Sequence, residues 1–460
     1  MGSSPSLYLL GDVGSTFTKL CLVDAGAPAV LASAAAPTTV GTDVNAGFDA
    51  ALGRLGPRAR EAGRILVSSS AAGGLRIAAV GLVPELTMKA ARIAALGAGG
   101  KVVGAFSFRL TAQDLAGLRE LRPDMILLAG GTDGGDTEHI IHNAGALAAG
   151  LPGVPVVAAG NREAREELER IFAGRPEVRF AANVMPEVRR LDLDPARACI
   201  RELFLERIVA AKGLDRLRSR AEVVRPTPEA VLRAVALLSR GHGGSPGLGE
   251  LLAVDVGGAT TDVYSCAEGR PSSPAVVLRG LPEPFEKRTV EADIGMRHTI
   301  AHLLEQCDVE EVARAARATA DEVRAWAGAV AGDPGHLPAS EREHRIDAAL
   351  AAAGCRLAVA RHCGWLEECY TPEGRVYVQE GKDLGPVRCV VGSGGPLAAG
   401  GPRAGEVLAG ARRAPGESRL LPSAPEFLID RRYLLWAMGL LADHEPAAAL
   451  ELMKRHLEPC

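Results

Sequence analysis

Two stretches far apart in the chain repeat one another, and this repeat constrains the fold more than any other feature. DVGSTFTK, from Asp12 to Lys19, aligns with DVGGATTD, from Asp255 to Asp262, and the two share Asp, Val, Gly and one Thr. Short apolar runs flank both copies: LYLL and LCLV surround the first, and LLAV and VYSC surround the second. A strand, a tight glycine turn and another strand are typical of a β-hairpin with a polar tip. The repeat therefore predicts two related α/β domains.

A glycine-rich segment follows each copy of the repeat. ILLAGGTDGG (126–135) follows the first copy, and CVVGSGGPLA (389–398) follows the second. Each is an apolar strand that ends in a glycine turn, so we align the two segments as a second repeated pair. The same order of elements, found twice, predicts two lobes with a cleft between them.

The segments between the two copies predict further α/β structure. VPVVAAG (154–160), NREAREELERIF (161–172) and VRFAANV (178–184) have the pattern of a strand, a helix and a strand. This order is typical of a parallel βαβ unit. We expect three regions: a first lobe over 1–150, an inserted or connecting α/β region over 151–248, and a second lobe with C-terminal helices over 249–460.

Three other segments carry local predictions. RILVSSSAAGGLRIAAVGL (64–82) predicts two strands around a glycine turn, and GHGGSPGLG (241–249) predicts a flexible hinge before the second copy. DRRYLLWAMGLLADH (430–444) has the apolar periodicity of a helix.

The first hairpin tip has the composition of a phosphate site. A tight glycine turn points successive backbone N–H groups outward, and such a concavity binds phosphate oxygens. Asp12 would repel phosphate, so a carboxylate at this tip is explained if Mg²⁺ lies between them and is held through water. The residues expected at the phosphate are Gly14, Ser15, Thr16, Thr18 and Lys19, although strand alternation can turn Lys19 away.

The second tip repeats this pattern with a further carboxylate. We expect Asp255 to hold Mg²⁺ through water, and Asp255 or Asp262 to orient an attacking water molecule, with Asp255 preferred. The residues expected at the phosphate are Gly257, Gly258, Thr260 and Thr261. Ordinary hairpin turns use the same residue types, so one tip alone would indicate little. Two copies in the same strand context favour a nucleotide site.

Two more glycine segments can complete such a site. In VVGSGGP, Gly392, Gly394 and Gly395 are candidates to line the nucleoside, although a simple strand-to-helix turn explains them too. In EADIGMRHTIAHLL (291–304), a helix that starts near Met296 would bring Gly295 towards the nucleotide, with a helix cap and solvated charges as the alternative.

Composition excludes several classes of protein. The net charge is −4 and aromatic residues make up 4% of the chain, so neither a basic field nor a base-stacking platform for nucleic acid is present. The chain has no apolar run of membrane-spanning length and no signal peptide, so we expect a cytoplasmic protein without a membrane partner. The nine cysteines, including Cys355 to Cys389, lack the CxxC spacing of a metal site.

The motifs also resemble those of known proteins. GDVGSTFTK, AVDVGGATTDV and VVGSGGP resemble the phosphate-one, phosphate-two and adenosine motifs of the actin/Hsp70/sugar-kinase ATPase superfamily. ILLAGGTDGG, VPVVAAGN, ANVMPEV, VDVGGATTDV and TVEADIGMR are similar to segments of the MutL (glutamate mutase-associated) family. The resemblance implies an α/β, actin-like ATPase fold, in which two duplicated RNase H-like lobes flank a nucleotide cleft and a βαβ region is inserted.

The family resemblance also implies a function. Members are accessory proteins of adenosylcobalamin-dependent mutases such as glutamate mutase and ornithine aminomutase. It therefore implies a Mg²⁺-dependent ATPase that converts ATP to ADP and phosphate and acts as a reactivating chaperone of such a mutase, as a monomer or homodimer.

Three alternatives remain open. The first is a small-molecule kinase of the same fold, with Asp133 or Asp136 as general base. The second is a non-catalytic actin-like assembly or binding protein, and the third is an activator that carries an iron–sulfur cluster.

Overall fold

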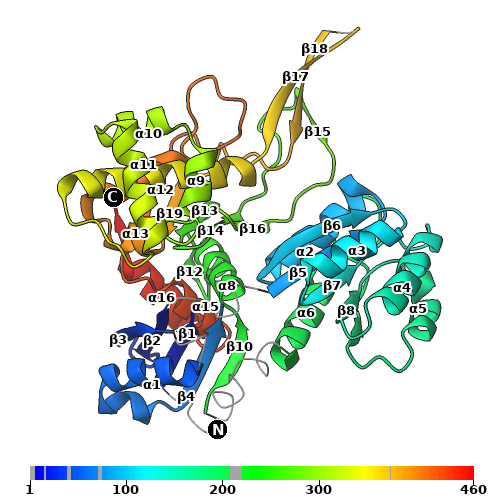
Figure 1. The fold of residues 1–460 in the computed structure, drawn as a ribbon, viewed down its shortest axis with the longest axis horizontal. Coiled ribbons are helices and arrows are strands. Elements are labelled where there is room, and N and C mark those ends of the chain that lie inside the picture. The colour runs from blue at the N-terminus through cyan, green and yellow to red at the C-terminus, as the bar shows by residue number, and fades with distance from the viewer. Residues whose placement is uncertain (1–5, 15–16, 39–42, 71–74, 208–219, 373) are drawn as a thin grey trace. The chain divides into compact units, whose positions relative to one another are not determined.

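The computed structural model describes residues 6–14, 17–38, 43–70, 75–207, 220–372 and 374–460. The chain forms two compact units (Figure 1). Unit 1 contains Met1–Ala234 and Trp436–Leu452, and unit 2 contains Val235–Leu435 and Met453–Cys460. No helix within the described ranges is both long and apolar enough to cross a bilayer.

The first sheet of unit 1 carries the first copy of the repeat. Its five strands lie in the order β10-β4-β1-β2-β3. β1 pairs antiparallel with β2 and parallel with β4, and β10 continues the sheet in parallel with β4. The strands are β1 (Leu7–Val13), β2 (Phe17–Asp24), β3 (Ala29–Pro37), β4 (Arg64–Ser69) and β10 (Glu222–Pro226). The helices that follow β3, α1 and β10 are α1 (Val44–Leu55), the short η1 (Pro57–Glu61) and α8 (Thr227–Arg240).

Unit 1 also contains a second, fully parallel sheet. Its strand order is β6-β5-β7-β8-β9, the doubly wound order in which the first strand in sequence lies second in space. The strands are β5 (Leu75–Gly81), β6 (Gly100–Ser107), β7 (Met125–Leu128), β8 (Val156–Ala158) and β9 (Val178–Phe180). The helices between them are η2 (Pro84–Met88), α2 (Lys89–Gly97), α3 (Ala112–Leu121), α4 (Glu138–Gly150), η3 (Arg162–Ala164) and α5 (Arg165–Ile171), with α6 (Asp194–Arg207) after β9.

The βαβ unit predicted around residues 154–184 is confirmed, because β8 and β9 pair in parallel on either side of α5. Residue 150 lies inside the span of this second sheet. The expected domain boundaries at 150 and 248 stay predictions.

Unit 2 is built around a six-stranded sheet in the order β16-β14-β13-β19-β20-β21. The strands are β13 (Leu251–Val256), β14 (Thr261–Cys266), β16 (Glu286–Glu291), β19 (Cys389–Ser393), β20 (Glu426–Asp430) and β21 (Leu457–Pro459). The helices are α9 (Ile300–Gln306), α10 (Val309–Ala316), α11 (Ala320–Gly332), α12 (Glu341–His362), α13 (Gly395–Ala399), η5 (Gly401–Arg403), α14 (Ala404–Leu408) and η6 (Ala409–Ala411).

The two sheets confirm the duplication that the repeat predicts. In each, an antiparallel hairpin is followed by a third antiparallel strand on one side and by two parallel strands on the other. β1, β2, β3, β4 and β10 thus correspond to β13, β14, β16, β19 and β20. The α/β class with two duplicated sheets is therefore established.

The expected alignment of ILLAGGTDGG with CVVGSGGPLA is wrong. CVVGS forms β19 beside β13, and the strand in the same place beside β1 is β4. ILLAGG belongs to β7 and its turn in the other sheet of unit 1. An apolar strand with a glycine turn is a pattern that unrelated parallel strands share, so it gave a false match.

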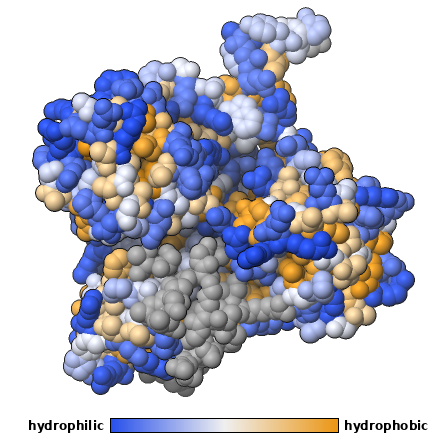
Figure 2. Space-filling model, in the orientation of Figure 1, coloured by the Kyte–Doolittle hydropathy of each residue, from blue (hydrophilic) through white to orange (hydrophobic). Residues whose placement is uncertain are grey.

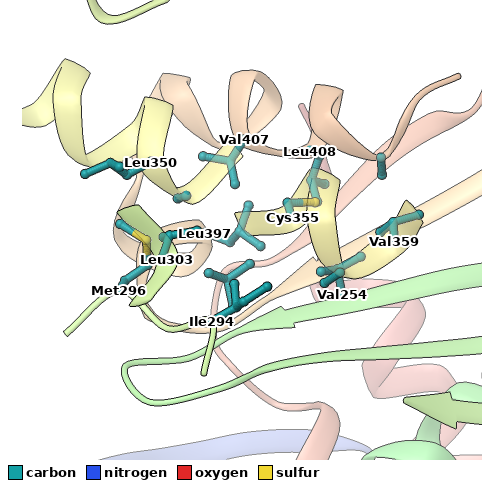
Figure 3. Close-up of a cluster of buried hydrophobic side chains, with 14 of the residues drawn as sticks. Val254, Ile294, Met296, Leu303, Leu350, Cys355, Val359, Leu397, Val407 and Leu408 are labelled. Atoms are coloured by element: carbon teal, nitrogen blue, oxygen red, sulfur yellow. The ribbon is translucent and has the colours of Figure 1, made fainter. Parts of the chain in front are cut away.

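One hydrophobic cluster supports the second hairpin. Val254 and Val256 of β13 pack with Ile294 and Met296, and with Leu397 of α13. Helix α12 contributes Leu350, Cys355 and Val359, and Figure 3 shows these side chains gathered between helices and strands. The residues before and after Gly295 are therefore fixed by the same core that holds β13.

Two smaller sheets complete unit 2. β15 (Val276–Arg279), β18 (Gly374–Glu380) and β17 (Trp365–Thr371) form a three-stranded arm that extends from the helices of this unit (Figure 1). Figure 2 shows its surface as mostly hydrophilic to intermediate. β11 (Gly241–His242) and β12 (Ser245–Pro246) pair as a short ribbon, where the sequence predicted a flexible hinge.

Two further local predictions need correction. The strands predicted at 64–82 both exist, but β4 and β5 belong to different sheets. The helix predicted at 430–444 begins later, as α15 (Leu435–Leu441), and α16 (Pro446–His456) follows. Tyr433 has a positive φ of 54°, which a helix does not allow, and Asp430 still belongs to β20.

Candidate functional site

The first tip is closed by one backbone hydrogen bond. The N–H of Gly14 donates to the carbonyl of Phe17 at 3.1 Å, and a Cβ on Gly14 would lie 2.6 Å from that oxygen. Only glycine fits here, as the sequence indicates. Ser15 and Thr16, which are predicted phosphate ligands, lie outside the described residues.

Asp12 lies at this tip in a shell of donors. Its side chain is 3% exposed and Oδ1 accepts hydrogen bonds from Ser68 Oγ at 3.2 Å and Thr227 Oγ1 at 2.5 Å. Lys19 stands opposite in the hairpin register, and its Nζ lies 3.6 Å from Asp12 Oδ2. Sequence reasoning missed Ser68 and Thr227, because only the parallel strands β4 and β10 bring them to the tip.

Thr18 has a different environment from the one expected. Its side chain is fully buried, and its hydroxyl shares a 2.9 Å hydrogen bond with that of Thr38. A phosphate contact by Thr18 stays a prediction, and in this structure the hydroxyl is engaged inside the sheet.

The second tip has the same closure as the first. The N–H of Gly257 donates to the carbonyl of Thr260 at 2.9 Å, and a Cβ on Gly257 would lie 2.8 Å from that oxygen. Gly14 and Gly257 therefore play the same structural part. Asp, Gly and the buried Thr therefore occupy the same positions relative to this turn in the two copies.

The segment Ile294–Thr299 wraps the second tip. Met296 N donates to Gly257 O at 3.0 Å, and the N–H groups of Arg297 and His298 both donate to Gly258 O at 2.8 Å. A Cβ on Gly295 would lie 2.4 Å from the carbonyl carbon of Ala259, so this glycine permits the close approach. These hydrogen bonds fix the backbone of the tip. The helix expected to start near Met296 begins later, as α9 at Ile300.

Several polar groups at the second tip are already engaged. Thr261 is 1% exposed and its hydroxyl donates to Ile294 O at 2.8 Å. Asp262 Oδ1 accepts from Arg288 Nε at 2.8 Å, and Thr260 Oγ1 donates to Asp262 Oδ2 at 3.2 Å. Arg297 pairs with Asp347 at 2.9 Å. The Asp262 carboxylate is therefore committed to Arg288 and Thr260.

Asp255 lies next to the glycine turn that follows β19. Asp255 and Ser393 are partners in the parallel register of β13 and β19. Gly394 has a φ of 98°, and a Cβ there would lie 2.2 Å from Val256 O and 2.6 Å from Asp255 Oδ1. The sequence predicted that these motifs meet, and in unit 2 the structure brings Asp255, Gly257 and Gly394 together.

The three glycines proposed for the nucleoside differ in their surroundings. Gly392 is buried against Leu408 and Ile429, so it serves the packing of β19. Gly394 is buried next to the Asp255 carboxylate. Gly395 is exposed, and a Cβ there would meet no atom within 4 Å. A nucleoside contact is therefore most accessible at Gly395, and all three assignments stay predictions.

The donor set at each tip is compatible with Mg²⁺. One carboxylate with hydroxyl and backbone groups matches an ion that keeps most of its water and takes one or two protein carboxylates. Among the described residues, no group of three or more His, Cys, Asp and Glu side chains is arranged to hold a metal ion. Asp12 and Asp255 would hold Mg²⁺ through its water.

The other candidate clusters have structural partners. Asp133 Oδ1 accepts from Arg162 N at 3.0 Å and Asn183 Nδ2 at 2.9 Å, and Asp136 accepts from His139 N at 3.1 Å. Burial raises the pKa of the Cys355 thiol to about 12 and, chiefly by the same cause, that of Cys389 to about 11.

Comparison with known structures finds remote similarity. The chain aligns over 95% of its length with 70% of acetone carboxylase, with a TM-score of 0.42 and 13% identity. It aligns over 98% of its length with 97% of the activator of the 2-hydroxyisocaproyl-CoA dehydratase from Clostridium difficile, with a TM-score of 0.30 and 12% identity.

Comparison by sequence is much closer. The family model described as MutL protein matches residues 8–457. Protein MutL of Clostridium tetanomorphum is 43% identical over 458 residues, which cover 98% of this chain and 99% of that protein. The chain belongs to the MutL protein family.

Proposed function

We propose that this protein is a Mg²⁺-dependent ATPase that converts ATP to ADP and phosphate. One observation carries the proposal: an aspartate and a glycine-closed turn with the same hydrogen bond occupy corresponding places in both duplicated sheets. A structural hairpin needs the glycine but has no need of a carboxylate at the corresponding place in both halves. Phosphate oxygens bound by the turn and a metal held by the carboxylate account for both features.

The residues would divide the work as follows. At each tip, backbone N–H groups and nearby hydroxyls would bind phosphate oxygens, and Gly395 would face the nucleoside. Asp255 would accept a proton from the attacking water and orient it towards the γ-phosphate. Mg²⁺, when bound, would neutralise charge on the phosphates. Asp12 would hold it through its water; in the structure Asp12 Oδ1 accepts from Ser68 and Thr227, and Oδ2 lies 3.6 Å from Lys19 Nζ.

We further propose that the ATPase serves an adenosylcobalamin-dependent mutase as an accessory or reactivating protein. Membership of the MutL protein family, whose model matches residues 8–457, supports this step together with the sequence segments that resemble mutase-associated proteins. If ATP and ADP favour different states of the protein, hydrolysis would act on the partner through a shift between those states.

Phosphate release by the purified chain tests the proposal. Release should require both ATP and Mg²⁺, and Asp255→Ala should abolish it without loss of folding. Asp321→Ala is the matched control, because the Asp321 side chain is 96% exposed on α11 and far in sequence from either tip. Unchanged release in Asp255→Ala would disprove the site.

The same preparation separates the alternatives. Transfer of phosphate to an added small molecule, in place of release, would indicate a kinase. Nucleotide-dependent sedimentation without release would indicate an assembly protein, and visible absorbance of anaerobic protein would indicate an iron–sulfur activator. Addition of the chain with ATP to an inactivated mutase should restore mutase turnover. No recovery with any mutase encoded by a neighbouring gene would disprove the proposed partner.

A further inference from the structure

Tyr433 has an unusual backbone conformation between β20 and α15. Its φ is 54°, a value that bulky side chains rarely adopt and that surrounding structure must impose. Asp430 imposes it: its Oδ1 accepts from Leu434 N at 2.8 Å, its Oδ2 accepts from Leu435 N at 2.9 Å, and its carbonyl accepts from Tyr433 N at 3.0 Å. The side chain of Asp430 is 2% exposed, so the turn is fixed from inside unit 2.

This turn directs the Tyr433 hydroxyl to the second tip. Tyr433 Oη donates to Asp255 Oδ2 at 3.3 Å, while the other carboxylate oxygen of Asp255 is the one nearest Gly394. Asp430 also accepts a hydrogen bond from Ser393 Oγ at 3.2 Å. One buried carboxylate thus fixes both the residue before Gly394 and the tyrosine that reaches Asp255, so the Asp255 carboxylate is held on both sides.

The corresponding place in unit 1 carries the same kind of contact. Thr227 directly follows β10, the counterpart of β20, and its hydroxyl donates to Asp12 Oδ1. Thr227 and Tyr433 differ greatly in size and backbone conformation. What the two places share is a hydroxyl that donates to the aspartate of the tip. Side-chain packing alone would not place a hydroxyl donor beside the tip aspartate in both halves.

We propose that Tyr433 is a positioning residue for Asp255. Its hydroxyl holds the carboxylate in the orientation that binds Mg²⁺ water and directs the attacking water, and the strained turn after β20 places that hydroxyl. This inference rests on the proposed ATPase function.

Tyr433→Phe tests the hydroxyl alone, because the ring and the backbone strain remain. We expect kcat for phosphate release to fall about 10-fold, the loss for one hydrogen bond to a charged group, while KM for ATP changes less than about 2-fold. The Mg²⁺ concentration for half-maximal rate should rise about 10-fold. Tyr370→Phe is the control: it makes the same chemical change on the arm, where Tyr370 is 80% exposed.

Tyr433→Asn separates strain from the hydroxyl. Asn accepts a positive φ more readily than Tyr, so thermal stability should be retained or raised while the kinetic loss of Tyr433→Phe persists. If Tyr433→Phe keeps the wild-type kcat and Mg²⁺ dependence, or if both variants lose only thermal stability, the proposal is overturned.

A binding measurement distinguishes failure of this inference from failure of the proposed function. Calorimetry with ADP and Mg²⁺ should show about 10-fold weaker Mg²⁺-dependent binding in Tyr433→Phe than in the wild type. If the wild type releases no phosphate but this difference in binding is seen, the ATPase proposal fails and the positioning role stands. Equal binding in both proteins, or no Mg²⁺-dependent binding by the wild type, overturns the positioning role.

Discussion

The two tips share a backbone but differ in charge. Both close with a hydrogen bond from glycine to the residue three positions on, at 3.1 Å in the first and 2.9 Å in the second. The residue opposite the tip aspartate is Lys19 in the first and Asp262 in the second. The first tip therefore carries its own cation, while the second carries two carboxylates and receives its cation from Arg288 on β16.

Under the proposed function, this difference would give the two halves different tasks. In unit 1 the ion pair of Lys19 and Asp12 balances the tip, and Asp12 is buried. In unit 2 the pairing of Asp262 with Arg288 leaves Asp255 as the half-buried carboxylate beside the turn. A duplicated scaffold can thus provide one tip that mainly binds and another that also acts on water. The following changes would break or sharpen this comparison.

The largest effect is expected for the tip aspartates themselves. Asp255→Asn should lower the rate of phosphate release about 1,000-fold, because it removes both the base and a metal contact. Asp12→Asn removes a metal contact and the ion pair with Lys19 but no base, so a loss of about 100-fold is expected. Steady-state phosphate release measures both. Equal losses would contradict the division of tasks, and wild-type rates would contradict the site.

The next largest effect separates the two cations. Arg288 is 3% exposed, so Arg288→Met leaves the Asp262 carboxylate buried without its partner and should lower the free energy of unfolding by about 3–5 kcal/mol. Lys19 is 28% exposed and Asp12 keeps its hydrogen bonds from Ser68 and Thr227, so Lys19→Met should cost less, about 1 kcal/mol. Urea unfolding compares the two variants. Similar losses would show that the two ion pairs are buried to a similar extent in solution.

A smaller effect is expected where the segment Ile294–Thr299 contacts the second tip. Gly295→Ala would place a Cβ 2.4 Å from backbone, so it should lower the free energy of unfolding by about 2 kcal/mol and reduce phosphate release as the tip shifts. Gly328→Ala on α11 is the control, since a Cβ there meets nothing within 4 Å. If both variants unfold alike, the tip does not depend on this contact.

Residues at fixed local spacing made the tips predictable from the sequence. Asp12, Gly14 and Thr18 recur at the same spacing as Asp255, Gly257 and Thr261, and the shared turn requires the glycine, so the repeat was visible without any structure. The hydroxyls of Ser68, Thr227 and Tyr433 were not predictable. These hydroxyls reach the tips through parallel strand pairing and through the turn after β20. Such contacts between distant parts of the chain leave no local sequence pattern.

The wrong predictions for the segments 430–444 and ILLAGG arose in the same way, because a local sequence pattern does not report non-local structure. The segment at 430–444 has helical apolar spacing throughout, yet the backbone of Tyr433 is left-handed and α15 starts only at Leu435. Apolar periodicity indicates which side chains are buried, but it does not reveal a single residue with a strained backbone. The strand–glycine pattern of ILLAGG likewise reports a buried strand and not the sheet to which it belongs.

The smallest effect concerns β14, the second strand of the second hairpin. Ser265 on β14 accepts a hydrogen bond from Lys382 Nζ at 3.3 Å, while the corresponding position of β2 is the buried Leu22. Burial and the nearby ammonium of Lys287 lower the pKa of Lys382 to about 8. The unfolded chain, where lysine has its ordinary pKa of about 10.4, then binds more protons than the folded chain between these values. The free energy of unfolding should therefore rise with pH in this window, by up to about 1.4 kcal/mol per pH unit from this group.

Lys382→Met should remove this rise. Urea unfolding at pH 7.5, 8.5 and 9.5 measures it as the difference between wild type and variant, which cancels the opposing contribution of buried thiols such as Cys266, whose pKa burial raises to about 12. A parallel pH dependence in the two proteins would mean that Lys382 keeps its ordinary pKa. The buried cation would then not distinguish the second hairpin from the first, and the difference between the halves would be confined to the tips.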